Sequence, residues 1–554
     1  MSSSDTSSTS WVSWSSASIL TSSGQRPSLI NVNRCQNWEV AAPVTPEPPA
    51  LRPAPDRRTT PLPASFTLHE AASTVHLDDG ALVLGGSPVR LFRISARAQR
   101  LVERWRVGQA VGEQQGARLL ARRLASSGAY LPRPTTSALG TGDVTVVVPV
   151  RDRPAQLDRL LRAVSDLSCV VVDDASADAG GIKEIAERHG ARFVALGDNR
   201  GPAGARNAGL AAVHTPLAAF VDSDCVPAPG WLDPLLGHFD DPLVGAVAPR
   251  VVPARHTDTR DPVQAYESVR SSLDRGTTEG PVRRGSPIPY VPSAALLVRV
   301  AAASGAALFD PTLRSGEDVD LVWRLADAGW DVRYVPQSTV EHDGPSSFGD
   351  FLARRAFYGM SAAPLALRHR GALAPLDVSA WSLAVWLLVA KRRPVLALAT
   401  LAASIGLLAN RLRGLTTDPL GLATRIAGDG TARAAVPALS GLTRAWSPAL
   451  LIGLAFRRTR RASALALLIP ALADLRMDRA GKESGTGLRP GPYVALHVAD
   501  DAAYGAGVWL GCVGARTVAP LVPRVSLNAR VWSAQSLRDS LSRGSEPEPR
   551  VTPG

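Results

Sequence analysis

The stretch "VTVVVPVRDRPAQLDRLLRAVSDLSCVVVDDAS", residues 144–176, decides the fold of this chain. Its first segment is apolar with almost no polar alternation, which indicates a strand buried on both faces. Pro154 suits the first position of a helix, and Leu157, Leu160 and Leu161 follow at helical spacing. The segment "CVVVDD" is then a second buried strand. Strand, helix and strand in this order predict a parallel βαβ unit.

The same alternation continues along the chain. The segments "ARFVAL" and "LAAFVD" predict a third and a fourth strand, and "GPAGARNAGL" opens a helix between them. Another helix follows Gly316, and "WDVRYVP" predicts a strand after it. Residues 141–350 are therefore predicted to form an α/β domain around a Rossmann-like mixed sheet.

The flanking regions differ from this domain in composition. Residues 1–64 are rich in Ser, Thr and Pro and are expected to be a disordered tail, as are residues 526–554. Residues 65–140 combine two short apolar strands with two helices, which favours a small winged-helix-like α+β module. Residues 351–525 hold several apolar segments, each shorter than the roughly 20 residues of a simple membrane-spanning helix. Hairpins, interfacial helices and packed spans all remain open for these segments.

Charge and cysteine content narrow the class of protein. The formal charge of +12 would suit a nucleic-acid partner, but many arginines lie beside apolar runs, as in "KRRP" at 391–394 and "RRTRR" at 457–461. This pattern favours the surface of a membrane on its cytoplasmic side over nucleic acid. The four cysteines form no CxxC pair, which indicates a reducing compartment without disulfides. We therefore expect a protein at the cell membrane, with its α/β domain in the cytoplasm and no nucleic-acid partner.

Polar residues follow three of the predicted strands. Arg151 follows the first strand, Asp173 and Asp174 end the second, and Asp222 and Asp224 follow the fourth. Ligands of open α/β sheets bind beyond the carboxyl ends of the strands. Residues i and i+2 of an extended chain face the same side, so the last two aspartates are expected to face one cation. Hard carboxylate ligands suit Mg²⁺ or Mn²⁺, which would neutralise a bound diphosphate.

Two further features allow both a functional and a structural interpretation. His342 follows a later strand and is either an imidazole ligand of the same cation or a structural histidine. Glu317 and Asp318 begin a helix, where acidic residues are favoured by the helix dipole. One of the two carboxylates could instead act as a general base on a hydroxyl group. Position along the chain does not choose between these interpretations.

Five segments, taken in order, resemble the family-2 glycosyltransferases of the GT-A fold: "VTVVVPVRDR", "VVVDDAS", "GPAGARNAG", "FVDSD" and "SGEDVDLVWR". The flanking segments "LVLGGSPVRLFRIS", "YVPSAALLVR", "RRAFYGMSAAPLALRH" and "DDAAYGAGVWLG" are similar to those of the mycofactocin-system members of that family. The resemblance implies transfer of glucose from UDP-glucose, with inversion to a β-linkage. The implied acceptor is premycofactocin, a peptide-derived redox cofactor precursor, glycosylated once or repeatedly to an oligoglucoside.

The resemblance also assigns roles to individual residues. Asp318 falls at the position of the catalytic base, with Glu317 beside it. The donor site would comprise Arg151, Asp173, Asp174, Arg206 and Asp222, and the ligands of Mn²⁺ or Mg²⁺ would be Asp222, Asp224 and His342. The chain has no QxxRW segment of the kind that processive synthases carry, so synthesis of long chains is not expected.

The small module at residues 65–140 resembles PqqD-like winged helices that recognise modified peptides. It would either dock a peptide-derived acceptor or only pack against the catalytic domain, and the sequence leaves both open. The main alternative function is that of a membrane-associated family-2 glycosyltransferase acting on a lipid or cell-wall glycan. A binding protein with a degenerate transferase core is disfavoured by the intact acidic residues. A sugar nucleotidyltransferase is disfavoured because "VRDRPAQL" lacks a glycine.

Overall fold

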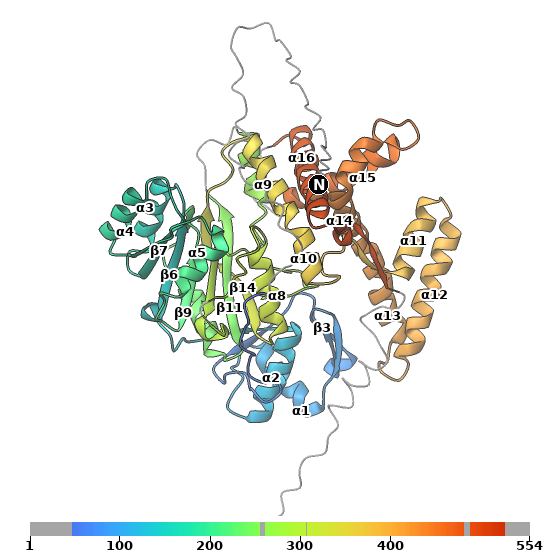
Figure 1. The fold of residues 1–554 in the computed structure, drawn as a ribbon. Helices are drawn as coiled ribbons and strands as arrows, with labels where there is room; N and C mark the ends of the chain where they lie inside the picture. Colours follow the sequence, from blue (N-terminus) through green and yellow to red (C-terminus); the bar gives the residue numbers. More distant parts are fainter. Residues whose placement is uncertain (1–46, 255–260, 306, 481–487, 527–554) are drawn as a thin grey trace, which may run out of the picture. The chain divides into compact units, whose positions relative to one another are not determined.

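The computed structural model describes residues 47–254, 261–305, 307–480 and 488–526 (Figure 1). Most of the two predicted tails, at residues 1–64 and 526–554, lies outside the described residues, as does Cys35.

A sheet of nine strands forms the centre of the α/β domain, in the order β10-β14-β11-β13-β9-β6-β7-β8, with β12 paired to β14. Neighbours from β9 to β8 are parallel, whereas β13 runs antiparallel to both β9 and β11. The mixed α/β fold predicted from the sequence is therefore confirmed. The strands are β6 (Val144–Val150), β7 (Ser168–Asp173), β8 (Arg192–Ala195), β9 (Leu217–Val221), β10 (Cys225–Pro227), β11 (Val244–Pro253), β12 (Gly280–Pro281), β13 (Ala295–Arg299) and β14 (Asp331–His342).

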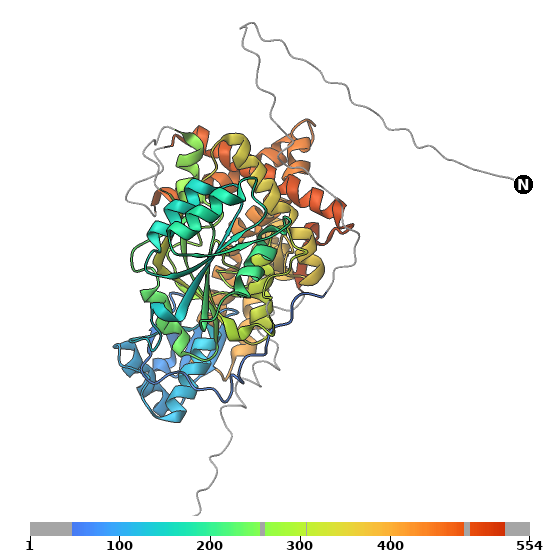
Figure 2. The same ribbon diagram turned by 60° about the vertical axis from the view of Figure 1, so that its left-hand side comes forward.

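Helices cover both faces of this sheet (Figure 2). Alternate residues of β6 point to opposite sides, so Val146 and Val148 lie in one core and Val147 in the other. The first core includes α3 (Pro154–Ala163) and α4 (Ala179–Arg188). The second includes α5 (Gly201–Leu210) and α8 (Glu317–Asp327). This double burial explains why β6 is apolar along almost its whole length.

Gly209 shows how closely α5 lies against the sheet. A Cβ at this position would come within 2.3 Å of Val147 Cγ1. One glycine of the glycine-rich segment therefore serves helix–strand packing. This packing fixes the position of Arg206, one turn earlier on the same helix.

The small module before the sheet is built from two short sheets and two helices. Strand β1 (Thr67–Glu70) pairs with β5 (Tyr130–Arg133), and α1 (Ala96–Arg106) and α2 (Gln115–Ser127) share its core. The second sheet has three strands where the sequence predicted two: β2 (Val75–Leu77), β3 (Leu82–Gly85) and β4 (Arg90–Arg93). The extra strand is short enough to be hidden in a turn-rich segment.

Residues 47–64, which the sequence analysis assigns to the tail, contact folded parts of the chain. Leu51 forms a β-bridge with Ala303, and Leu62 is fully buried in the core of the small module. Arg57 pairs with Asp331 at 2.9 Å. This segment is rich in proline, and apolar residues spaced along it provide the burial that orders it.

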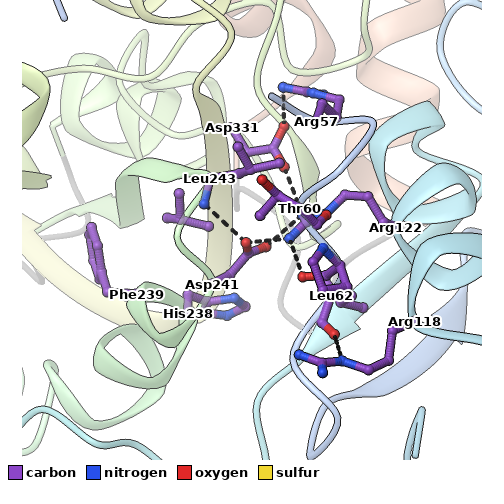
Figure 3. Close-up of polar contacts among 12 residues, drawn as sticks. Arg57, Thr60, Leu62, Arg118, Arg122, His238, Phe239, Asp241, Leu243 and Asp331 are labelled. Carbon is purple, nitrogen blue, oxygen red and sulfur yellow. Dashed lines mark hydrogen bonds and ion pairs between the residues drawn. The ribbon is translucent and has the colours of Figure 1, made fainter. Parts of the chain in front are cut away.

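A buried ionic junction joins the small module to the catalytic sheet (Figure 3). Arg122 of α2 donates to both carboxylate oxygens of Asp241, at 2.8 and 2.5 Å. Arg333 of β14 pairs with the same carboxylate, which is fully buried. The two arginines hold the pKa of Asp241 below its usual range despite the opposing effect of burial.

The C-terminal region is helical. Within the described residues, one helix is long and apolar enough to cross a membrane, α12, whose window of highest hydropathy is 11% buried. The elements of this region are α9 (Phe348–Met360), α10 (Ala362–Arg368), α11 (Ala380–Ala390), α12 (Pro394–Leu412), α13 (Pro419–Ala423), α14 (Gly430–Gly453), α15 (Arg460–Ala480) and α16 (Pro490–Gly514), with strands β15 (Asp377–Ser379) and β16 (Arg524–Ser526). Two further helices, α6 (Asp233–Leu236) and α7 (Pro262–Arg270), belong to the α/β domain.

Helices α9 and α16 lie side by side in the C-terminal region (Figure 1). A Cβ at Gly507 would come within 2.0 Å of the carbonyl oxygen of Ala356, so the two backbones are in contact. This contact holds α9 against the C-terminal helices while its other face meets the end of the catalytic sheet.

Candidate active site

Helix α8 places Glu317 and Asp318 at its first turn, after Gly316 in the left-handed region at φ 78°. The two carboxylates have different surroundings. Glu317 is buried and accepts a hydrogen bond from Arg206 Nη1 at 2.8 Å. Asp318 is partly exposed, and the structure gives it no arginine partner among the described residues.

Arg206 connects the two acidic segments of the site. Its side chain is 3% exposed, and its Nη2 donates to Asp222 Oδ1 at 2.6 Å. The guanidinium also lies over the ring of Phe309, 5.3 Å from the centroid. One buried cation therefore fixes the spacing between Asp222 and the start of α8.

Asp318 is held by backbone groups. Its Oδ2 accepts from the backbone N–H of Ser293 at 3.3 Å, and its Oδ1 from that of Val319 at 2.7 Å. Burial raises the pKa of Asp318, which increases the basicity of its carboxylate. Burial and the charge of Asp318 raise the pKa of Glu317 to about 7, although Arg206 opposes this. Asp318, which is partly exposed and unpaired, has the surroundings that a general base needs.

The positions of Asp222 and Asp224 differ from the sequence argument. That argument used the alternation of an extended strand, but the two residues lie in a turn between β9 and β10, closed by the bond from Cys225 N to Asp222 O at 2.9 Å. Asp222 pairs with Arg206, whereas Asp224 pairs with Arg153. The structure therefore brings both carboxylates to the sheet edge through a turn.

His342 lies next to Asp224 because β10 pairs with β14. Cys225 is opposite His342 in that register, and His342 Nε2 is 3.6 Å from Asp224 Oδ2. Burial lowers the pKa of His342, so its imidazole is neutral near pH 7 and has a lone pair for a cation.

The residues present fit a divalent cation that binds together with a substrate. Among the described residues, no group of three or more His, Cys, Asp or Glu side chains is close enough to hold a metal ion alone. Mg²⁺, however, is commonly held by one or two carboxylates together with substrate phosphates and water. Asp224, Asp222 and His342 have the ligand chemistry for such a site.

The predicted donor residues lie at the adjacent strand ends. Asp173 and Asp174 are buried at the end of β7. Asp173 accepts from the backbone N–H of Ser176 at 3.3 Å, and Asp174 Oδ1 accepts from that of Arg200 at 2.7 Å. Burial raises the pKa of Asp174, and the charge of Arg151 acts in the opposite direction.

Arg153 and Ser293 also belong to this site, but the sequence analysis did not single them out. The signal for Arg153 was its position two residues after Arg151, immediately beyond β6. Ser293 carried no signal, because it acts through its backbone amide.

Comparison with known proteins identifies the family. The family description "Glycosyl transferase family 2" matches residues 145–304. The "Pre-mycofactocin glycosyltransferase" of Mycobacterium tuberculosis (strain ATCC 25618 / H37Rv) is 40% identical over 477 residues, which cover 84% of this chain and 99% of the relative. The chain belongs to the mycofactocin-system family-2 glycosyltransferases. The predicted family and the predicted glycosyltransferase class are confirmed.

More distant relatives match shorter parts of this glycosyltransferase. "Glycosyltransferase AglE" of Haloferax volcanii is 25% identical over 266 residues, which cover 44% of the chain and 80% of the relative. A solved structure of S. aureus TarS 1–349 matches at 17% identity and a TM-score of 0.29, covering 52% of this chain and 91% of that one.

Proposed function

We propose that this glycosyltransferase transfers glucose from UDP-glucose to premycofactocin with inversion, giving a β-linked product. The observation that supports the proposal best is the pair of carboxylates at the start of α8. Glu317 is paired with Arg206, while Asp318 has no arginine partner among the described residues and is partly exposed beside it. The named M. tuberculosis relative supports the acceptor class.

In the proposed mechanism, Asp318 accepts the proton of the acceptor hydroxyl. The hydroxyl oxygen attacks the anomeric carbon while the bond from that carbon to the diphosphate oxygen breaks, and UDP leaves from the opposite face. The proton on Asp318 is then released to water. The backbone N–H groups of Ser293 and Val319 hold the Asp318 carboxylate in place for this step.

The other proposed roles concern the donor. Arg151, Asp173 and Asp174 would hold the uridine, and Arg206 would keep Asp222 in position near the diphosphate. Asp222, Asp224 and His342 would hold Mn²⁺ or Mg²⁺, which when bound neutralises charge on the leaving diphosphate. Repeated transfer to an oligoglucoside is part of the proposal.

We also propose that the helices within residues 351–525 keep the enzyme at the cytoplasmic face of the cell membrane. The exposed apolar side chains of α12 support this, among them Val395, Leu396 and Leu398. These side chains also favour the second candidate, transfer to a lipid or cell-wall glycan. The module at residues 65–140 is proposed to recognise the peptide-derived acceptor.

The experiment is mass spectrometry of reactions containing UDP-glucose, premycofactocin and Mn²⁺, with and without a chelator. We expect a hexose-sized gain in acceptor mass that is lost with the chelator. Asp318→Asn should lower the rate by about 100-fold or more, because general base catalysis typically contributes that much. Glu317→Gln is the matched control and should retain more activity. Hydrolysis of UDP-glucose without transfer to premycofactocin would instead indicate a lipid or glycan acceptor.

A further inference from the structure

Helix α9 presents one charged face to the end of the catalytic sheet. Arg354 and Tyr358 are four residues apart, so they lie on the same face of the helix. Both line a small cavity together with His342, Gly344 and Pro345 from the end of β14 and the segment after it. The C-terminal helices therefore reach the site that the catalytic sheet forms.

Backbone contacts connect Arg354 to Asp224. The backbone N–H of Asp343 donates to the carbonyl oxygen of Asp224 at 3.0 Å. The Nη1 of Arg354 lies 3.5 Å from the carbonyl oxygen of Asp343. The guanidinium of Arg354 therefore contacts the residue whose backbone is hydrogen-bonded to Asp224, the aspartate expected to hold the cation.

Arg354 differs from the other arginines of the site in its partners. Arg206 pairs with Asp222 and Glu317, and Arg153 pairs with Asp224. Within the described part of the chain, Arg354 forms no ion pair with a carboxylate. Its positive charge is nevertheless close enough to lower the pKa of His342, a secondary contribution beside that of burial.

An unpaired guanidinium at this point has an evident use in the reaction. The leaving nucleoside diphosphate carries more negative charge than the donor, and a guanidinium binds phosphate oxygens through two parallel N–H groups. We propose that Arg354 binds the diphosphate of the nucleotide-sugar donor and of the nucleotide product. This inference rests on the proposed function, because it requires a nucleoside diphosphate donor.

The test is calorimetric titration of the full chain with UDP and, separately, with uridine, in the presence of Mn²⁺. The variants are Arg354→Ala, Arg354→Lys and a control, Arg97→Ala on the exposed side of α1. We expect Arg354→Ala to weaken UDP binding by roughly 10- to 100-fold, the range for a hydrogen bond to a charged group. Uridine binding should not change, and Arg354→Lys should restore part of the UDP affinity.

Three outcomes would contradict the proposal. If Arg354→Ala binds UDP as tightly as wild type, Arg354 does not contact the diphosphate. If UDP and uridine binding are weakened by the same factor, the residue is structural. If the wild-type chain itself binds no UDP, the donor assignment fails and this inference fails with it.

Discussion

Replacing Arg206 by methionine should destabilise the protein in a pH-dependent manner. The substitution removes the guanidinium that lies over the ring of Phe309 and leaves Glu317 and Asp222 without their shared cation. Breaking a buried ion pair from one side costs about 3–5 kcal/mol. We expect the larger loss at pH 8, above the pKa of about 7 at which Glu317 ionises in the wild-type protein.

The loss of unfolding free energy in Arg206→Met should be smaller at acidic pH, because Glu317 is then protonated. Its pKa of about 7 is already raised from 4.5, so ionisation destabilises the folded state as pH rises through that range. Without Arg206, the main group opposing this rise is gone, and the carboxyl stays neutral to a higher pH. At pH 5 a neutral Glu317 needs no cation, so less of the stability is lost.

The assay is denaturant unfolding at pH 5 and pH 8, followed by tryptophan fluorescence. Arg151→Met is the matched control, because Arg151 is half exposed and its ion-pair partner in the described structure is the exposed Asp152, at 3.6 Å. Its midpoint should shift little, as for other exposed pairs. If Arg206→Met shifts the midpoint equally at both pH values, the reasoning from buried carboxylates is refuted.

Three other predictions concern regions outside the catalytic residues. Burial raises the pKa of Glu267 from 4.5 to about 7, so its ionisation lowers the free energy of unfolding as pH rises through this range. The wild-type protein should therefore lose up to about 3 kcal/mol of stability between pH 5 and pH 8 from this group, and Glu267→Gln should not show this loss in unfolding experiments. Arg122→Leu should lower the free energy of unfolding by about 3–5 kcal/mol, because the buried Asp241 loses one of its two arginine partners. An unchanged denaturant midpoint would show that the ionic junction does not stabilise the fold. Glutamate at both Leu396 and Leu398 should reduce co-sedimentation with anionic vesicles several-fold, whereas glutamate at the exposed Val107 should not.

The sequence predicts the sheet well because its strands carry the information locally. In β6 an almost unbroken apolar run requires burial on both faces, and the leucines of α3 repeat at helical spacing. Four strands of the sheet, β10, β11, β12 and β13, were not predicted. β10 and β12 are two or three residues long, too short for a periodic pattern, and β11 is interrupted by Gly245 and Pro249. The order of the strands depends on contacts between distant segments, which no local pattern records.

The candidate site could be predicted only in part for a similar reason. Asp318 and Asp222 stand at recognisable positions beside a strand or a helix start. Arg354 lies in a helix that looks structural, and only the folded chain shows that it approaches His342. The pairing of Arg206 with both acidic segments likewise depends on how α5 and α8 pack together.

The ionic junction also limits how this enzyme can be taken apart or recombined. Asp241 pairs with both Arg122 of the small module and Arg333 of the sheet. If the two parts were separated, Arg122 would lose its carboxylate partner and Asp241 would lose one of its two arginines. A chimera that exchanges the module between relatives must preserve this charge pairing, and a truncated catalytic fragment would expose it to water. Shortened versions of the chain should therefore keep the small module, including Arg122, together with the sheet.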